Sequence, residues 1–355
     1  MRIGVPKEIK PLEGRVGLIP AACADLVRAG HSLFVEQGAG LKSGYPDAAY
    51  SALGVTVVPD AEQLYAKAEF IVKVKEPIEA DLRLLRAEHI LFCYLHLAAS
   101  RALTERLQAI GLTAIAFETV EQDGTLPLLA PMSDIAGRLA IQVGTHLLHQ
   151  PQGGKGVLLG GLPGVERGKV TVIGAGQAGG NAAALAAALG AEVTVFDRKR
   201  DRLEVMRALG SNVTALYPYA DALEQAVREA DLLVGAVLIP GAKATHVVSA
   251  AQVRSMSPGS VIVDISVDQG GCIETTRPTT YAAPTYDVGG VLHFCVTNMP
   301  GAVPHSASQA LSAAVLPYVL QLAGGSAWRQ NAALVKGINV EAGTLCHPAV
   351  QAAFA

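Results

Sequence analysis

Short apolar runs alternate with longer segments of helical periodicity along nearly the whole chain. In the first half the apolar runs are Arg2–Val5, His31–Glu36, Phe70–Val74, Ile90–Leu95 and Thr113–Phe117, with helical segments at Ala21–Ala29 and Asp81–Ala87. In the second half they are Val170–Ile173, Val193–Phe196, Leu232–Ala236, Val261–Ile265 and Leu292–Val296. Continuously apolar strands between helices are typical of parallel sheets that are buried on both faces. The pattern therefore predicts an α/β protein with two doubly wound, Rossmann-like domains built on parallel sheets.

Two longer helical patterns indicate where one domain passes into the next. Ser133 and Asp134 form an N-cap signal before the pattern at Ile135–Leu148, and a loop at Asn298–Pro304 precedes the pattern at Ser306–Leu322. The tail beyond is too short to form a domain, so we expect it to return to the first one. We predict a first domain of residues 1–130 plus 305–355 and a second of residues 131–304, joined by the long helices with a cleft between them.

The second domain opens on a dinucleotide-binding fingerprint. The strand at Val170–Ile173 leads into the turn Gly174-Ala175-Gly176-Gln177-Ala178-Gly179, and an alanine-rich helical segment and a second strand follow, ending at Asp197. The first glycine permits the tight turn, the second lets the backbone approach a pyrophosphate, and the third lets the helix pack on the strand. The helix N-terminus attracts phosphate, and the acid accepts hydrogen bonds from the adenosine ribose.

Composition narrows the class of protein. Half of the 355 residues are hydrophobic, the formal net charge is −3 and the isoelectric point is near 6.3, so neither nucleic acid nor an anionic membrane is an expected partner. The uncharged run Val170–Ala191 is long enough to span a bilayer, but its glycines and its strand-like start argue against that. The five scattered cysteines show no zinc spacing and are typical of reduced thiols. We expect a cytoplasmic protein without signal peptide or metal.

Polar residues follow several apolar runs, where ligands of open α/β sheets bind. Lys75, His96 and Asp268 each come at the end of such a run, and Arg15 lies in the loop after the first strand. A cation, a proton shuttle and a carboxylate in these places suit a dehydrogenase acting on a small acid. Spacing alone leaves the alternatives open: a solvated lysine, a buried histidine with its bonds satisfied, a surface arginine and an aspartate that starts a turn.

Over its full length the chain resembles the family of alanine dehydrogenases, which also contains the soluble nucleotide-binding subunit of proton-translocating transhydrogenase. The matching segments are Met1–Lys10, Val72–Pro77, Tyr94–Ala98, Pro131–Ser133, Gly235–Lys243, Val267–Gly271, Asn298–Pro304 and Lys336–Asn339. The resemblance implies reversible, NAD-dependent oxidative deamination of L-alanine to pyruvate and ammonia. It further implies that the first domain binds the substrate, that the second binds NAD, and that the protein is a homohexamer.

The resemblance also implies roles for individual residues. Arg15 and Lys75 would hold the substrate carboxylate, His96 would be the general acid/base, and Asp268 would assist the water and ammonia chemistry and orient the substrate. Met132 would lie on the nicotinamide side. The residues expected to bind the cofactor are Gly174, Gly176, Gln177, Ala178, Gly179, Asp197, Arg202, Ser133, Val237, Leu238, Asp268, Asn298 and Met299.

Three points remain open in the sequence. Where the family usually has Tyr-Ser near the adenosine, this chain has Tyr217-Pro218, so a hydroxyl contact is expected to be lost. Asp197 favours NAD, whereas the basic run Arg198–Arg200 would suit the extra phosphate of NADP; we expect the fixed carboxylate to decide for NAD. The alternative functions are a transhydrogenase-type NAD(H)-binding subunit, which is expected to lack the catalytic set, and an NAD-sensing protein without turnover.

Overall fold

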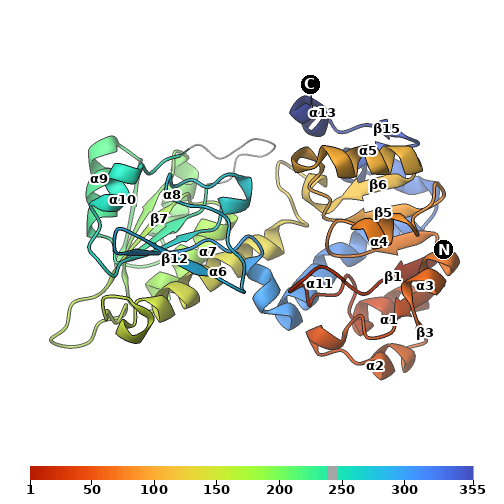
Figure 1. The fold of residues 1–355 in the computed structure, drawn as a ribbon, viewed down its shortest axis with the longest axis horizontal. Coiled ribbons are helices and arrows are strands. Elements are labelled where there is room, and N and C mark those ends of the chain that lie inside the picture. Colours follow the sequence, from red (N-terminus) through yellow and green to blue (C-terminus); the bar gives the residue numbers. More distant parts are fainter. Residues whose placement is uncertain (238–245, 355) are drawn as a thin grey trace. The chain divides into compact units, whose positions relative to one another are not determined.

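The structure is a computed structural model that describes residues 1–237 and 246–354. The chain folds into two compact units, Met1–Met132 with Gly301–Ala355 as unit 1 and Ser133–Pro300 as unit 2. Unit 1 contains the segments coloured red to yellow at the start of the chain in Figure 1, together with the blue C-terminal ones. Unit 2 contains the part of the sequence from Ser133 to Pro300. The assignment of substrate to one unit and cofactor to the other stays a prediction.

Unit 1 is built on an eight-stranded sheet ordered β15-β14-β6-β5-β4-β1-β2-β3. The strands are β1 (Arg2–Val5), β2 (Ser32–Glu36), β3 (Thr56–Val58), β4 (Phe70–Val72), β5 (Ile90–Cys93), β6 (Thr113–Ala116), β14 (Ile338–Glu341) and β15 (Thr344–Leu345). From β3 to β6 all pairs are parallel and follow the doubly wound order 3-2-1-4-5-6. The order reverses between β1 and β4, which is where such sheets bind ligands.

The helices of unit 1 connect these strands and cover the sheet (Figure 1). They are α1 (Pro20–Arg28), α2 (Asp47–Ser51), α3 (Ala61–Lys67), α4 (Glu79–Leu82), α5 (Arg101–Ile110), α11 (Pro304–Ala323), α12 (Ala332–Lys336) and α13 (Pro348–Phe354). The serine hydroxyls of α11 accept the backbone N–H groups of Val16 and Ile19, at Ser308 (3.0 Å) and Ser312 (2.9 Å). The C-terminal part of the chain thus fixes the loop that follows β1.

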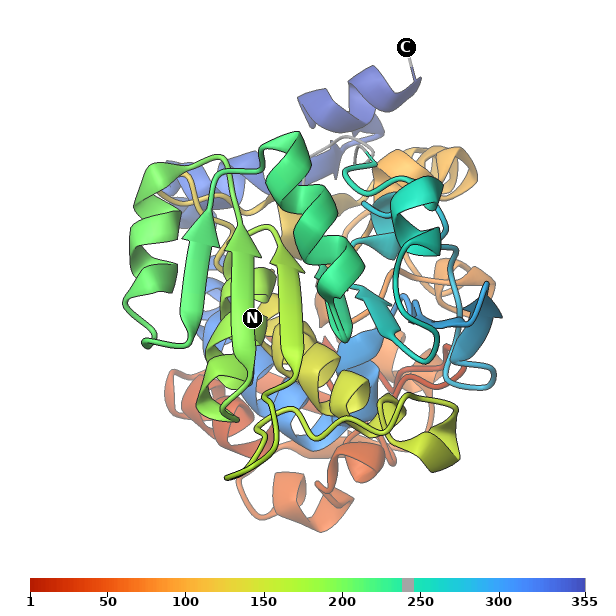
Figure 2. The same ribbon diagram turned by 90° about the vertical axis from the view of Figure 1, so that its left-hand side faces the viewer.

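Unit 2 is built on a seven-stranded sheet ordered β12-β13-β11-β10-β7-β8-β9. Its strands are β7 (Lys169–Ile173), β8 (Glu192–Phe196), β9 (Val213–Leu216), β10 (Leu232–Gly235), β11 (Val261–Asp264), β12 (Thr285–Val288) and β13 (Val291–Phe294). Figure 2 faces this sheet, and the green arrows of β7, β8 and β9 point the same way. Counting only the parallel strands, the order from β9 to β13 is again 3-2-1-4-5-6, with the reversal between β7 and β10.

The helices of unit 2 include α7 (Gln177–Ala188), α8 (Arg200–Arg207), α9 (Ala220–Glu229) and α10 (Ala250–Arg254). A further helix, α6 (Ala130–Leu147), starts in unit 1 and lies mostly in unit 2. The run Val170–Ala191, whose length suggested a bilayer span, forms β7, the glycine turn and α7. Within the described part of the chain, no helix has both the length and the hydropathy that crossing a bilayer requires.

The structure confirms the predicted fold of two doubly wound α/β sheets and corrects two details. Each sheet carries antiparallel strands at one edge, since β12 pairs with β13 and β14 pairs with β6 and β15. The N-cap prediction at Ser133 and Asp134 was wrong, because α6 already begins at Ala130. Pro131 needs no helical hydrogen bond in a first turn, and the carboxylate of Asp134 instead accepts side-chain amides from α7.

Candidate functional site

The glycine turn of unit 2 has the geometry that a dinucleotide site requires. Gly174 follows β7 at a φ of +99°, and a Cβ at this position would lie 2.5 Å from the carbonyl oxygen of Ala236, which follows β10. A Cβ on Gly179 would lie 1.8 Å from the carbonyl oxygen of Gly174. Gly176, the N-cap of α7, instead faces open space, where the nearest atom to such a Cβ is Nη1 of Arg202 at 3.6 Å. Two glycines are thus required by the fold, and Gly176 leaves room in front of the helix N-terminus.

Asp197 connects the end of β8 to this turn. Its carboxylate accepts the N–H of Ala175 (2.8 Å) and, through the other oxygen, the N–H of Lys199 (2.8 Å). Nη1 of Arg202 lies 3.5 Å from Oδ2 and is half-exposed. The cation that accompanies Asp197 is therefore Arg202, while Arg198–Arg200 are exposed and Arg200 pairs with Glu204 at 3.0 Å. A hollow of about 410 Å³ beside the turn is lined by Ala175, Gly176, Gln177, Gly180, Asn181, Ala184, Arg202, Val205, Met206 and Leu209.

A second carboxylate, not predicted as part of the site, holds the turn from the opposite direction. Oδ1 of Asp134, on α6, accepts the side-chain amides of Gln177 (2.5 Å) and Asn181 (2.7 Å). The helices approach closely because α6 carries Gly137, whose Cβ would lie 2.1 Å from the carbonyl oxygen of Ala178. Gln177 is therefore oriented by α6, and the neighbouring Ser133 lies on the same helical turn as Asp134. The N-cap pattern drew attention to this pair but assigned it the wrong role.

The other cofactor residues predicted in unit 2 follow the carboxyl ends of its strands. Val237 comes after β10, Asp268 after β11, and Asn298 and Met299 after β13. Asp268 is exposed and lies in the short 3-10 helix Val267–Gln269. The backbone carbonyl of Met299 accepts the hydroxyl of Tyr281 at 2.8 Å. Leu238, predicted to contact the cofactor, lies outside the described residues.

In unit 1, the switch point between β1 and β4 is organised by the buried residue Glu8. Its Oε1 accepts the backbone N–H groups of Val74 (2.6 Å) and Lys75 (3.2 Å). The buried Nζ of Lys73 pairs with Asp81 (2.7 Å) and lies 4.0 Å from Oε2 of Glu8. Burial lowers the pKa of Lys75, and the positive charge of Arg15 lowers it further. A cation whose charge is disfavoured in this way is stabilised when an anion binds beside it.

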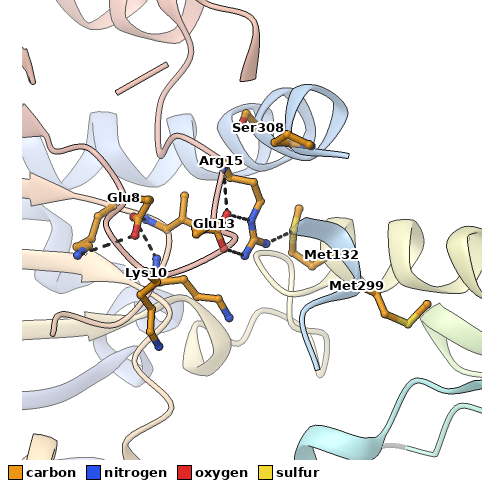
Figure 3. A network of polar contacts seen from close by, with 12 residues as sticks. Glu8, Lys10, Glu13, Arg15, Met132, Met299 and Ser308 are labelled. Atoms are coloured by element: carbon orange, nitrogen blue, oxygen red, sulfur yellow. Dashed lines mark hydrogen bonds and ion pairs between the residues drawn. The ribbon is translucent and has the colours of Figure 1, made fainter. Parts of the chain in front are cut away.

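Arg15 is held by a neighbouring acid that the sequence analysis did not single out (Figure 3). Glu13 accepts Nε (2.7 Å) and Nη2 (2.6 Å) of Arg15 in a bidentate ion pair that is almost completely buried. Nη1 lies 3.1 Å from the sulfur of Met132. The pKa of Arg15 is raised: burial opposes its charge, but the hydrogen bonds and charge of Glu13 outweigh that effect. One edge of the guanidinium is therefore occupied by Glu13, which fixes the direction of Arg15.

His96 lies beyond β5 in a conformation that few residues other than glycine adopt. Its φ is +50° and its side chain is 43% exposed. Glu118, after β6, accepts the backbone N–H groups of His96 (2.6 Å) and Leu95 (3.1 Å), and its Oε1 lies 3.9 Å from Nδ1 of the imidazole. The ring stacks on buried Tyr94, with 5.9 Å between centroids. A strained, exposed histidine beside a carboxylate is suited to proton transfer.

Unit 1 therefore contains Lys75, Arg15 and His96 on loops at the carboxyl ends of its strands, and unit 2 contains the glycine turn and Asp197. Sequence reasoning missed Glu13, Glu118 and Asp134, the acids that orient these groups. Glu118 followed an apolar run, which was a usable signal, whereas Asp134 was visible only as a cap. Among the described residues, no group of three or more histidine, cysteine, aspartate or glutamate side chains is placed to hold a metal ion.

Comparison with known proteins agrees with this arrangement. The family models "Alanine dehydrogenase/PNT, N-terminal domain" and "Alanine dehydrogenase/PNT, C-terminal domain" match residues 4–136 and 140–348. Alanine dehydrogenase of Mycobacterium tuberculosis is 51% identical over 97% of this chain and 94% of its own length, and that of Bacillus subtilis is 48% identical over 99% and 94%.

Two solved structures distinguish the branches of the family. An L-alanine dehydrogenase superposes with a TM-score of 0.96 at 53% identity, covering 100% of this chain and 99% of its own. A transhydrogenase from Sinorhizobium meliloti superposes with a TM-score of 0.85 at 27% identity, covering 98% of this chain and 100% of its own. The chain belongs to the alanine dehydrogenase/PNT family.

Proposed function

We propose that the protein is an NAD-dependent L-alanine dehydrogenase that interconverts L-alanine with pyruvate and ammonia. The relatives that match along the whole chain at about half identity carry the name alanine dehydrogenase, whereas the transhydrogenase structure is far less similar. The observation that carries the proposal is in unit 1, where the pKa of the partly buried Lys75 is lowered and the neighbouring cation Arg15 is fixed by Glu13, so a bound anion would stabilise the charge of Lys75. Such a site suits the carboxylate that alanine and pyruvate share.

The residues of unit 1 supply binding and proton transfer. Lys75 attracts the carboxylate as a point charge, and Arg15, aligned by Glu13, contributes a second cation in a fixed direction. His96 exchanges protons with the nitrogen and oxygen on the substrate α-carbon, and Glu118 holds the backbone of His96 in its strained conformation. Asp268 orients the amine or the attacking water. The small side chain of alanine needs only a small apolar pocket.

The residues of unit 2 fit a nicotinamide dinucleotide. Gly176 leaves space at the N-terminus of α7, where N–H groups and the helix dipole attract a pyrophosphate. Asp197 has one N–H on each oxygen, which leaves acceptor capacity for ribose hydroxyls and places negative charge where NADP has its extra phosphate. When bound, NAD supplies the hydride acceptor, and we infer that it is preferred over NADP.

The experiment is an absorbance assay for NADH formation from L-alanine, run with the unmutated protein, His96→Ala and the control His149→Ala. His149 is exposed in unit 2 and has no assigned role. We expect His96→Ala to lower kcat by at least about a hundredfold, the scale of a lost acid/base group, with NADH binding and the control unaffected. Bound NADH without any alanine-dependent turnover in the unmutated protein would reject the proposal in favour of a nucleotide-binding subunit or sensor.

Two further expectations accompany this proposal. All five cysteines are unpaired thiols, four of them buried, which supports a cytoplasmic location. Assembly as a homohexamer stays a prediction from family resemblance, to be checked by light scattering.

A further inference from the structure

A buried carboxylate with no role in the preceding scheme lies at the end of β11. Asp264 is 0% exposed, and its oxygens accept several hydrogen bonds, including one from Sγ of Cys272 to Oδ1 at 3.8 Å. Oδ1 accepts the N–H of Ser266 (2.9 Å), and Oδ2 accepts the N–H of Cys272 (3.0 Å) and the hydroxyl of Thr276 (2.7 Å). All these donors belong to the segment that follows Asp264 in the chain. The carboxylate is therefore enclosed by its own downstream loop.

The bonds fix both ends of the turn that carries Asp268. Ser266 is the N-cap of the 3-10 helix Val267–Gln269, and its carbonyl oxygen accepts the N–H groups of Gln269 (2.9 Å) and Gly271 (3.1 Å). Cys272 is the first residue after the turn closes. The space inside is full, because a Cβ on Gly271 would lie 2.9 Å from Oδ2 of Asp264. The position of Asp268 is therefore determined by two anchors on one side chain.

The energetics show why the side chain is an acid. Burial raises the pKa of Asp264, against the lowering effect of the donors around it. A hydrophobic residue would avoid this desolvation cost but would leave the buried N–H groups of Ser266 and Cys272 without acceptors. An asparagine of the same shape could keep its oxygen toward Cys272 and Thr276, but its NH₂ group would then face the N–H of Ser266. One anchor of the turn would be lost.

We propose that Asp264 is a positioning residue for the dehydrogenase reaction, acting through Asp268 by anchoring the turn at Ser266 and Cys272. This inference rests on the proposed function, in which Asp268 orients the amine or water. Displacing a catalytic carboxylate by about 1 Å costs on the order of a hundredfold in rate. Asp264→Asn should therefore lower kcat by about ten- to a hundredfold.

The test is a double-mutant cycle of Asp264→Asn and Asp268→Asn, measured as kcat for alanine oxidation. If Asp264 acts through Asp268, then Asp264→Asn causes little further loss once Asp268 is already substituted. If the fold loss of kcat in the double variant equalled the product of the two single losses, the proposal would be overturned. Full activity of Asp268→Asn would overturn it as well. Thr276→Val, which removes one donor and leaves Asp264 intact, should give a smaller loss that Thr276→Ser avoids. If Asp264→Asn does not fold, the two Thr276 variants replace it in the test.

Hydrogen exchange supplies a readout that does not depend on turnover. Asp264→Asn should speed amide exchange in peptides covering residues 265–276 and leave the rest of unit 2 unchanged. The control is Asp231→Asn, at the opposite end of the sheet, where Oδ2 accepts the N–H of Lys169 at 2.7 Å. Unchanged exchange in residues 265–276 would overturn the anchoring role. Faster exchange in a protein that does not oxidise alanine would instead reject the proposed function and retain the anchor.

Discussion

Gly176→Ala and Gly179→Ala are the same chemical change three residues apart, and the structure predicts opposite consequences. The Cβ added at Gly179 would lie 1.8 Å from a backbone carbonyl oxygen, whereas real Cβ atoms essentially never come within 3.0 Å of such an atom. Strand β7 or helix α7 must then move by about 1 Å. Overpacking of this kind costs about 1–3 kcal/mol or more, beyond the roughly 1 kcal/mol that alanine gains over glycine inside a helix.

At Gly176 the added methyl group meets only the end of the half-exposed Arg202 side chain, at 3.6 Å. The φ of −73° suits alanine, so the free energy of unfolding should change by only a few tenths of a kcal/mol, the cost of a poorer N-cap. The methyl group would instead occupy the space where a pyrophosphate approaches the backbone. Losing one charge-assisted hydrogen bond there costs about 1.5–3 kcal/mol, or roughly ten- to a hundredfold in the Kd of NADH.

The assay combines thermal unfolding with titration of NADH fluorescence. Gly179→Ala should lower Tm by roughly 2–12 °C, since the cost is about 1–3 kcal/mol and 1 kcal/mol corresponds to roughly 2–4 °C for a domain of this size. Gly176→Ala should have the same Tm as the unmutated protein but bind NADH more weakly. Equal Tm values for Gly179→Ala and the unmutated protein would refute the steric argument. Unchanged NADH affinity in Gly176→Ala would show that the cofactor does not bind at this turn.

Three further predictions address the remaining groups. The lowered pKa of Lys75 means that its charge is lost at a lower pH than for an ordinary lysine. Propionate is a suitable inhibitor for the test because it has the carboxylate but no titrating amine. Its Ki should rise as the pH increases from 7 to 10. Lys75→Arg should remove that rise, and an identical rise in both proteins would contradict the assignment. Glu118→Gln keeps an acceptor oxygen but loses the negative charge beside His96, so kcat should fall about tenfold or more while NADH binding is retained. Kinetics like those of the unmutated protein would exclude a role for the charge of the carboxylate. The ratio of kcat/KM for NAD over NADP should exceed about a hundredfold and should narrow in Asp197→Asn, whereas comparable values in the unmutated protein would show that Arg202 outweighs Asp197.

The sequence by itself determined the features that depend on local order along the chain. Apolar runs located the central strands of both sheets, because a strand buried on both faces must be apolar throughout. The glycine turn and Asp197 were identified because their spacing is fixed by one β-α-β unit. The antiparallel strands β12, β14 and β15 escaped prediction, as did the parallel edge strands β3 and β9. All are short, and the pairing of the antiparallel ones depends on partners elsewhere in the fold.

Only the tertiary structure decided how the functional side chains are oriented. Glu118 supports His96 from 22 residues away, and Asp134 reaches Gln177 across 43 residues, distances over which sequence patterns carry no directional information. Glu13 and Asp264 are close in sequence to the residues they serve, but their role depends on burial, which turns an ordinary acid into a fixed acceptor. The identity of a residue tells which chemical role its side chain can have. The orientation of that side chain depends on buried hydrogen bonds that exist only after the chain has folded.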